Sequence, residues 1–201
     1  MFTGIVSELG LVSRISRSAE ITALDISAPQ TVTGLRIGDS IAVNGVCLTA
    51  VTIEGDIFTV EAMHETLARS SLAQLDEGVA VNLERPMLAS GRFDGHIVQG
   101  HVDAVGTVVS VAADGAAKRF TFSVPDTVAR YIVEKGSITV DGVSLTVTGV
   151  TPVAARQQTF EVAVIPHTLV ATVFGKYTVG SAVNIEVDVL AKYVERLVEV
   201  R

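Results

Sequence analysis

The chain has little of what cross-links proteins or binds polyanions. Its 201 residues include one cysteine, no tryptophan, and 15 lysines and arginines against 22 acidic residues. A single cysteine cannot form an intrachain disulfide, which is typical of proteins in a reducing cytosol. The formal net charge of −7, without any basic cluster, argues against a nucleic-acid partner.

Long apolar runs are also missing. Hydrophobic residues make up 48% of the chain and the mean hydropathy is +0.48, yet charged residues interrupt every stretch before the roughly 20 residues that span a bilayer. We therefore expect no membrane partner. The first repeated block begins at Phe2, so we expect no signal or transit peptide. The expected location is the cytoplasm.

Motifs of nucleotide and metal chemistry are absent from the sequence. It has no P-loop, no Gly-x-Gly-x-x-Gly between a strand and a helix, and no Gly-x-Ser-x-Gly elbow. His96 and His101 lie five residues apart, with Asp94 and Asp103 nearby, but this spacing matches no recognised zinc site. No metal is expected, and a nucleotide hydrolase or a dehydrogenase lacks support.

The chain does contain an internal repeat. Residues 2–6 (FTGIV) and 98–102 (VQGHV) each open one half. Residues 41–49 (IAVNGVCLT) return as 138–146 (ITVDGVSLT), and VNLE at 81–84 returns as VNIE at 183–186. Three blocks in the same order predict two copies of one small domain of roughly a hundred residues each. A duplicated pocket suits a reaction between two similar reactants.

Short β-rich segments separated by turn signals fill both halves. Asn44-Gly45 and Asp141-Gly142 are dipeptides that tolerate the positive φ of a tight hairpin. Each half offers about six strands and a helical turn or two, with helical candidates at residues 65–74 and 125–134. Closed antiparallel barrels remove exposed edges at this size. We expect an all-β fold: two tandem, similar, six-stranded Greek-key β-barrels plus a C-terminal α-helix.

The expected domains are 1–96, 97–186 and 187–201. Residues 85–96 carry a proline and two interior glycines and are the expected linker. The last segment places Leu190, Val194 and Leu197 at helical spacing with charged residues between them, which predicts an amphipathic helix. The helix either caps the second barrel or joins subunits, and its coiled-coil-like stripe favours the second interpretation.

The two copies differ at a few polar positions. Cys47 aligns with Ser144; a lone cysteine is often a small core residue, but a thiol and a hydroxyl at matched places also suit the edge of a ligand site. His101 aligns with Ile5 and points either to solvent or into a pocket, where imidazole suits proton transfer at neutral pH.

Three further positions have simpler alternatives. Lys135 aligns with Gly38, and taken alone it is a solvated surface lysine. Thr66 and Thr168 lie at the start of probable helical turns, where capping the helix is the ordinary role. The backbone groups of these turns could equally pair with a flat heterocycle.

Taken together, the opening block MFTGIV, the block NGVCLT with its copy DGVSLT, and the pairs Gly100-His101 and Lys135-Gly136 resemble the riboflavin synthase family of the alpha-chain type. The resemblance runs from residue 1 to the C-terminal helix. It implies a transferase that dismutates 6,7-dimethyl-8-ribityllumazine. One lumazine gives a four-carbon unit to another, yielding riboflavin and 5-amino-6-ribitylamino-pyrimidinedione in the last step of riboflavin biosynthesis.

The resemblance also implies an assembly. The C-terminal helix helps to build a homotrimer, and the reacting pockets belong to the N-terminal barrel of one subunit and the C-terminal barrel of its neighbour. No cofactor or metal takes part. A lumazine synthase is a possible partner, because members of this pathway sometimes lie inside a lumazine synthase shell.

The site residues follow from the same resemblance. His101 is expected to move a proton of the acidic 7-methyl group, Ser144 or Cys47 to position or activate a nucleophile, and Lys135 to take part in catalysis. Ser40 and Asp188 are weaker candidates for hydrogen bonding, and His167 stands where certain members carry an acidic residue. The expected substrate contacts are Gly4, Ile5, Val6, Cys47, Leu48, Thr49, Glu61, Ala62, Met63, His64, Glu65, Thr66, Gly100, His101, Val102, Lys135, Ser144, Leu145, Thr146, Ala163, Val164, Ile165, Pro166, His167 and Thr168.

Two other functions remain open at this point. A non-catalytic lumazine or flavin carrier would share the two-barrel plan, although a carrier needs only one good pocket. A β-barrel module of the kind found in flavin reductases would need a nucleotide-binding α/β domain, for which 201 residues leave no room.

Overall fold

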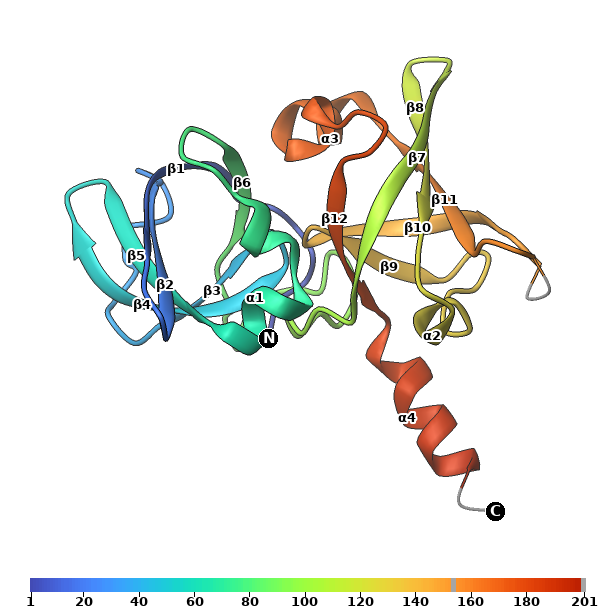
Figure 1. Ribbon diagram of the computed structural model, residues 1–201, viewed down its shortest axis with the longest axis horizontal. Coiled ribbons are helices and arrows are strands. Elements are labelled where there is room, and N and C mark those ends of the chain that lie inside the picture. Colours follow the sequence, from blue (N-terminus) through green and yellow to red (C-terminus); the bar gives the residue numbers. More distant parts are fainter. Residues whose placement is uncertain (153–154, 200–201) are drawn as a thin grey trace.

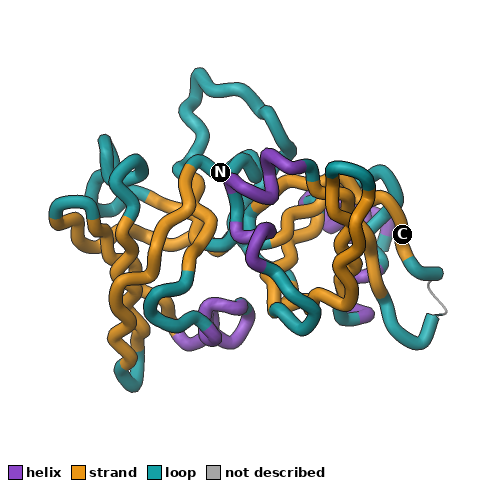
Figure 2. Tube along the Cα trace, turned by 90° about the horizontal axis from the view of Figure 1, so that it is seen from above, coloured by secondary structure: helices purple, strands orange, loops and turns teal. Residues whose placement is uncertain are grey.

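The computed structural model describes residues 1–152 and 155–199, and within them the strands form two closed barrels side by side (Figure 1). Seen from above, the strands again fall into two groups (Figure 2). The first barrel consists of β1 (Glu8–Arg17), β2 (Ile21–Ser27), β3 (Ser40–Val43), β4 (Val46–Glu54), β5 (Ile57–Met63) and β6 (Ala80–Glu84). The second consists of β7 (Ala104–Asp114), β8 (Ala117–Ser123), β9 (Ser137–Val140), β10 (Val143–Val150), β11 (Thr159–Val164) and β12 (Ala182–Val187).

The two barrels have the same topology. Their strands are neighbours in the order β1-β2-β5-β4-β3-β6 and β7-β8-β11-β10-β9-β12, and every pairing is antiparallel. The register shifts between Val12 and Arg14 in β1, and at the matching place between Val108 and Ser110 in β7. Because a bulge bends its strand, the shared bulges help both barrels to close in the same way. The predicted all-β fold of two Greek-key barrels and a C-terminal helix is confirmed.

The two predicted hairpins form and touch each other. Asn44 and Asp141 both have φ of 44°, and the glycines that follow have φ of 75° and 77°. This is the geometry that Asn-Gly and Asp-Gly dipeptides favour in tight hairpins. A Cβ atom on Gly45 would lie 2.6 Å from the backbone nitrogen of Gly142, so the turns of the two barrels meet backbone to backbone.

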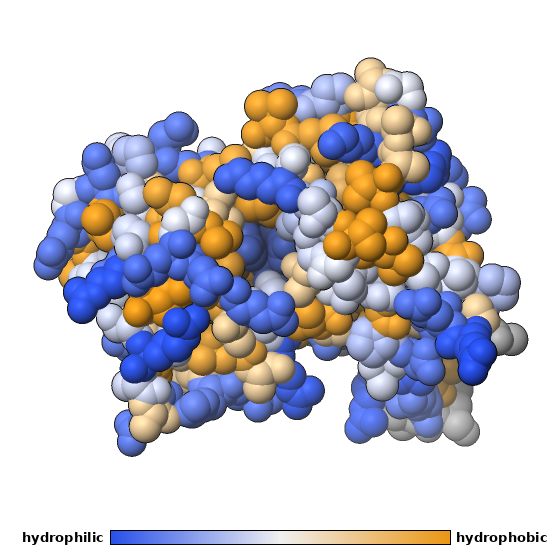
Figure 3. Space-filling view, turned by 45° about the horizontal axis from the view of Figure 1, so that its top comes forward, coloured by the Kyte–Doolittle hydropathy of each residue, from blue (hydrophilic) through white to orange (hydrophobic). Residues whose placement is uncertain are grey.

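Asparagines complete this junction with approximate two-fold symmetry. The side-chain amide of Asn82 donates to the carbonyl oxygen of Asp141 at 2.9 Å, and that of Asn184 donates to Asn44 at 2.8 Å. Their carbonyl oxygens accept from the backbone N–H groups of Val173 and Ser71 respectively. All these polar groups are paired across the interface, which fixes the two barrels relative to each other. The surface between the barrels is hollowed on one face (Figure 3).

The helices differ from the sequence expectation in length. The expected helix at 65–74 is two pieces, α1 (His64–Arg69) and the 3-10 turn η1 (Ser71–Gln74), because Ser70 between them is extended. The expected helix at 125–134 is only the single turn α2 (Asp126–Ala129). The second barrel repeats the first arrangement with α3 (Pro166–Ala171) and the 3-10 turn η2 (Val173–Lys176).

The C-terminal helix α4 (Val189–Val198) is amphipathic, as predicted, but it begins two residues later than expected. Val187 still belongs to β12, and the carboxylate of Asp188 caps the helix by accepting the N–H of Leu190 at 3.0 Å. The end of the expected segment, residues 200–201, lies outside the described residues. The helix projects away from the second barrel (Figure 1).

Candidate functional site

The opening segment of each half packs against the barrel formed by the other half. The carbonyl oxygen of Gly4 accepts the N–H of Ser144 in the second barrel at 2.7 Å, and that of Gly100 accepts the N–H of Cys47 in the first barrel at 2.9 Å. Val6 packs against the second core, whereas Val102 packs against the first. The wall of each candidate pocket is therefore completed by residues from the other repeat.

Only glycine fits at these two crossing points. Gly4 and Gly100 both have φ of 78°, a conformation that side chains other than glycine rarely adopt. A Cβ atom on Gly4 would lie 2.6 Å from Cβ of Ser144, and one on Gly100 would lie 2.6 Å from Cβ of Cys47. The absence of a side chain lets the opening segments lie directly on the candidate site residues.

Two buried glutamates hold the opening segments. Glu84 accepts the backbone N–H groups of Thr3 at 2.7 Å and Gly4 at 2.9 Å, together with the Thr3 hydroxyl. Burial raises the pKa of Glu84, and the hydrogen bonds from Thr3 and Gly4 oppose that change.

Glu186 does the same in the second half. It accepts the N–H groups of Gln99 at 2.8 Å, Gly100 at 2.9 Å and His101 at 3.2 Å. Burial raises its pKa to about 7, despite the hydrogen bonds from Gln99 and Gly100. Glu84 and Glu186 are the last residues of the repeated VNLE and VNIE blocks. The sequence repeat therefore includes both glutamates, but it does not indicate which backbone groups they bind.

The first candidate pocket surrounds Cys47. It is a cavity of about 190 Å³ lined by β4, α1 and the opening segment of the second half. In α1, Glu65 and Arg69 form an exposed ion pair with 2.9 Å between Nε and Oε1. Six predicted residues come together here and three unpredicted ones join them: Cys47, Glu65, Thr66, Gly100, His101 and Val102, with Val46, Arg69 and Ser70.

The second candidate site surrounds Ser144, at the place that matches Cys47. Ile5, which aligns with His101, directly follows Gly4 in the opening segment, and its side chain is 46% exposed. The hydroxyl oxygen of Ser144 lies 2.8 Å from Nδ1 of His96, a residue that the sequence analysis weighed only as a metal ligand. Burial lowers the pKa of His96, and the charge of Asp188 opposes that change.

Other predicted contacts lie around the barrel mouths or in the cores. The side chains of Leu48, Ala62 and Val164 are buried in the hydrophobic cores, so their polar contacts pass through the backbone. Thr66 and Thr168 do not cap helices, because Met63 and Ile165 hold the N-cap positions and make no side-chain cap. The remaining predicted contacts are partly or fully exposed on strands or short helices: Thr49, Glu61, Met63, His64, Leu145, Thr146, Ala163, Ile165, Pro166, His167 and Thr168.

Lys135 occupies an unusual backbone position. Its φ is 66°, and its N–H donates to the carbonyl of Val147 at 2.9 Å. The matching Gly38 has φ of 91° and donates to Ala50 at 2.8 Å. A lysine in the left-handed region carries strain that glycine avoids, which is a feature of functional positions.

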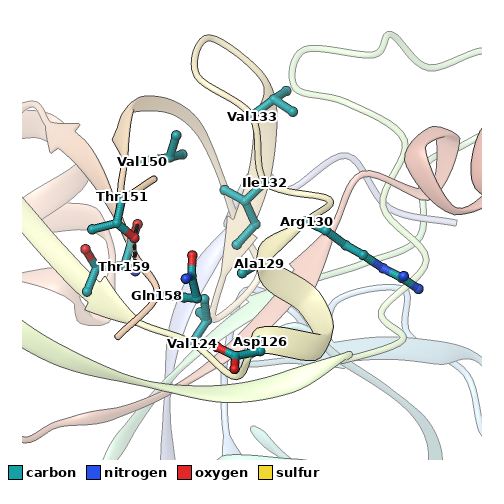
Figure 4. Close-up of a pocket in the computed structure, with 10 residues that line it drawn as sticks. All are labelled: Val124, Asp126, Ala129, Arg130, Ile132, Val133, Val150, Thr151, Gln158 and Thr159. Atoms are coloured by element: carbon teal, nitrogen blue, oxygen red, sulfur yellow. Dashed lines mark hydrogen bonds between the residues drawn. The ribbon is translucent and has the colours of Figure 1, made fainter. Parts of the chain in front are cut away.

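Two cavities on the second barrel are larger than the Cys47 pocket and contain none of the predicted catalytic residues. One of about 340 Å³ lies between α2 and the strand ends of the second barrel, where Thr159 donates its N–H to the hydroxyl of Thr151 (Figure 4). The other, of about 520 Å³, is a groove between α4 and the segment before β9. Both lie on the second barrel, away from the Cys47 pocket.

No set of three metal-ligating side chains converges in residues 1–152 and 155–199. In the same part of the chain, every helix is too short or too polar to cross a membrane.

A family model called the lumazine binding domain matches residues 3–86 and again 99–188. The tandem barrels and the two matched repeats thus define the chain as a two-domain member of the lumazine-binding class. Riboflavin synthase from Mycobacterium bovis is 50% identical over 198 residues, covering 98% of both chains. Riboflavin synthases from Bacillus subtilis and Schizosaccharomyces pombe are 42% and 44% identical, covering 98% and 99% of this chain and 89% and 94% of their own. The chain belongs to the riboflavin synthase family, and the predictions of this family and of a transferase enzyme are confirmed.

Solved structures show the same fold. LumP complexed with 6,7-dimethyl-8-(1'-D-ribityl) lumazine has a TM-score of 0.82 at 23% identity, covering 93% of this chain and 99% of its own. LumP complexed with riboflavin has a TM-score of 0.85 at 24% identity with the same coverage.

Proposed function

We propose that the chain converts two molecules of 6,7-dimethyl-8-ribityllumazine into riboflavin and 5-amino-6-ribitylamino-pyrimidinedione by transferring a four-carbon unit. The observation that carries this proposal is a pair of sites with the same backbone and different polar linings. One contains Cys47 and His101, and the other contains Ser144 and Ile5. Two copies of one substrate need similar pockets, whereas a donor and an acceptor need different chemistry.

The proposed roles follow the position of each residue. His101 would remove a proton from the 7-methyl group of one lumazine, because its backbone is held by Glu186 at the rim of the first pocket. Cys47 or Ser144 would position or activate the nucleophile that adds to the other ring, and Lys135 would bind substrate from its strained turn. Holding two rings face to face can lower the barrier by about 7–11 kcal/mol at best.

We infer that reacting pockets come from two subunits. The helices α1 and α3, which follow matching strands, lie apart in Figure 1, with α3 at the top of the second barrel and α1 lower, beside the first; this separation supports sites that meet between chains. Helix α4 supports an assembly, because Leu190, Val194, Leu197 and Val198 are each more than half exposed. The proposed assembly is a homotrimer in which the first barrel of one subunit faces the second barrel of its neighbour.

We propose that the protein acts in the cytoplasm. The single cysteine suits a reducing compartment. A lumazine synthase is the proposed partner, because it would supply the substrate.

Conversion of the lumazine tests the function directly. Purified protein is mixed with 6,7-dimethyl-8-ribityllumazine, and riboflavin absorbance is followed. We expect flavin to appear with one pyrimidinedione for each riboflavin. Stable fluorescence of bound lumazine without conversion would instead identify a carrier.

The role of His101 is tested with His101→Gln. General acid–base catalysis contributes about 10²–10⁴-fold, so turnover should fall by about a hundredfold or more. Exchange of the 7-methyl protons in deuterated water should slow in parallel, while lumazine still binds. Unchanged exchange would remove His101 from proton transfer.

Cys47→Ser separates a chemical role from packing. Serine replaces the thiol at the pocket edge by a small hydroxyl, so the variant should fold and bind lumazine but turn over more slowly. A fully active variant would make Cys47 a packing residue only.

A further inference from the structure

His96 is a partly buried polar residue that the reaction as proposed leaves without a role. It ends the segment between the barrels, and its N–H donates to the carbonyl of Thr3 at 3.2 Å. Its ring nitrogen Nδ1 lies 2.8 Å from Oγ of Ser144, the candidate site residue of the second barrel. The contact joins residues 48 positions apart in the chain, so the tertiary fold creates it.

The approach of this segment is specific. A Cβ atom on Gly95 would lie 2.1 Å from the carbonyl oxygen of Thr3 and 2.9 Å from Cβ of Ser144. Real side chains do not tolerate such distances, so the segment reaches Ser144 only because residue 95 is glycine. The imidazole is therefore held over Ser144 by the opening segment of the first half and by the close fit of the linker.

The first barrel has no matching arrangement. Cys47 meets the same kind of opening segment through the Gly100 carbonyl, but within residues 1–152 and 155–199 no imidazole is hydrogen-bonded to its thiol. An imidazole partner is thus a feature of the Ser144 site alone.

The charge state of His96 decides what it can do. Burial lowers its pKa, with the Asp188 carboxylate as the opposing influence, so the ring is neutral at neutral pH. A neutral imidazole has one nitrogen that donates and one that accepts. The hydroxyl of Ser144 can donate to Nδ1 only when the ring proton is on Nε2.

Building on the proposed function, we propose that His96 is a positioning residue whose Nδ1 accepts a hydrogen bond from the hydroxyl of Ser144. The hydroxyl then turns its oxygen lone pairs toward a lumazine in the second barrel. It serves there as an acceptor rather than a donor. In the first barrel no imidazole within residues 1–152 and 155–199 is hydrogen-bonded to the thiol of Cys47, so the two sites offer a bound heterocycle different hydrogen-bonding characters.

Turnover of three variants tests the positioning role. His96→Ala removes the acceptor, and we expect kcat to fall about tenfold with KM changed less than twofold, because the misdirected hydroxyl still leaves the pocket able to bind. His96→Asn places an amide oxygen near the position of Nδ1 and should recover at least a third of the lost activity. Asp94→Asn, on the same linker but exposed, should match the wild type.

Full activity of His96→Ala overturns the proposal. So does an equal loss in His96→Ala and His96→Asn, since that result indicates packing rather than hydrogen bonding. If His96→Ala does not fold, the comparison of His96→Asn with His96→Leu, which fills the space without an acceptor, decides the same question.

The tautomer gives a readout that does not depend on turnover. Long-range ¹H–¹⁵N spectra of the His96 ring should show the proton on Nε2, and Ser144→Ala should shift the Nδ1 signal toward that of an unbonded acceptor. A proton on Nδ1, or a spectrum unchanged by Ser144→Ala, overturns the proposal. If the wild type binds but does not convert lumazine, the proposed function fails, while this spectrum still decides whether His96 accepts from Ser144.

Discussion

The two barrels share a backbone but not its polar content. Strand order, bulges and hairpin dihedral angles repeat from one to the other. The second barrel nevertheless has Asp141 where the first has Asn44, and Lys135 where the first has Gly38. It also has Ser144 beside His96, where the first has Cys47 in a pocket that His101 helps to line. The two copies therefore share one backbone arrangement, and these polar differences lie at the candidate sites or where the halves meet.

The cores also differ. Phe120, Phe122, Phe160 and Phe174 pack against one another in the second barrel with ring centroids 5.2–6.2 Å apart, whereas Phe58 is the phenylalanine of the first core. The same barrel is therefore filled by aromatic rings in one copy and mainly by aliphatic side chains in the other. Core composition constrains this fold less than the turns and the interface do.

The largest expected effect is at the contact between hairpins. Gly45→Ala adds a Cβ atom 2.6 Å from the Gly142 nitrogen at a φ of 75°, so the barrels must separate or their turns must distort. We expect the free energy of unfolding in urea to fall by about 3 kcal/mol or more.

Gly55→Ala is the matched control, since its φ is 60° but an added Cβ meets nothing within 4 Å. It should cost only about 1 kcal/mol, the strain of the left-handed backbone. Equal losses in the two variants would mean that the hairpin contact does not hold the barrels together.

The next effect compares the two anchoring glutamates. Glu186→Gln and Glu84→Gln each replace one of two accepting oxygens by an NH2 group, which cannot accept, and this leaves a backbone N–H unpaired at a cost of about 1–3 kcal/mol. Because each glutamate holds the opening segment of its own half, amide hydrogen exchange should accelerate at Gly100 in the first variant and at Gly4 in the second. Acceleration at both segments in either variant would contradict the separate anchoring of each.

Asp141 should make the stability of the protein depend on pH, whereas the matching Asn44 of the first barrel does not titrate. The hydroxyl of Tyr177 and the N–H of Asn184 donate to this buried carboxyl, whereas Asn44 occupies the matching place in the first barrel. Burial raises the pKa of Asp141 to about 7 from 3.8, so the folded state binds its proton more tightly than the unfolded chain. This contribution to stability is complete below about pH 3.8 and is lost as pH rises toward and through 7.

Asp141→Asn should remove that dependence and gain about 1–2 kcal/mol over the wild type at pH 8, because it no longer buries a charge. Urea unfolding at several pH values measures the pH dependence of both proteins. The Glu186→Gln variant is measured in parallel, because the Glu186 carboxyl that it removes has its pKa raised to about 7 as well. If the free energy of unfolding changes with pH in Asp141→Asn as it does in the wild type, other groups cause the pH dependence.

The smallest effect is at Lys135. Lys135→Gly gives the second barrel the residue of the first and relieves a φ of 66°, which should add about 0.5–1 kcal/mol to the unfolding free energy. Lys135→Ala keeps the strain and removes the ammonium group, so it should bring no gain. Turnover should fall in both variants, and a stable Lys135→Gly enzyme with full activity would leave the lysine without a catalytic role.

Local signals in the sequence predicted the frame well. The Asn44-Gly45 and Asp141-Gly142 turns and the repeated blocks were sufficient for two barrels of the observed topology. Helix lengths were predicted less well, because the extended backbone of Ser70 and the short α2 depend on packing that a hydrophobic pattern does not encode.

The candidate site was predicted only in its residue types. Comparison of the copies singled out Cys47, Ser144 and His101, but no pattern in one sequence indicates that Gly100 lies on Cys47 and Gly4 on Ser144. His96 was missed as a partner of Ser144 for the same reason, since the path of a linker is decided by tertiary contacts.

The exchange of opening segments makes the two repeats interdependent. A substitution near Gly4 changes the surroundings of Ser144 in the second half, and one near Gly100 changes the surroundings of Cys47 in the first. An opening segment cannot be shortened or replaced without changing the site in the other half. Each half forms its own closed barrel, yet a complete candidate site requires backbone from both.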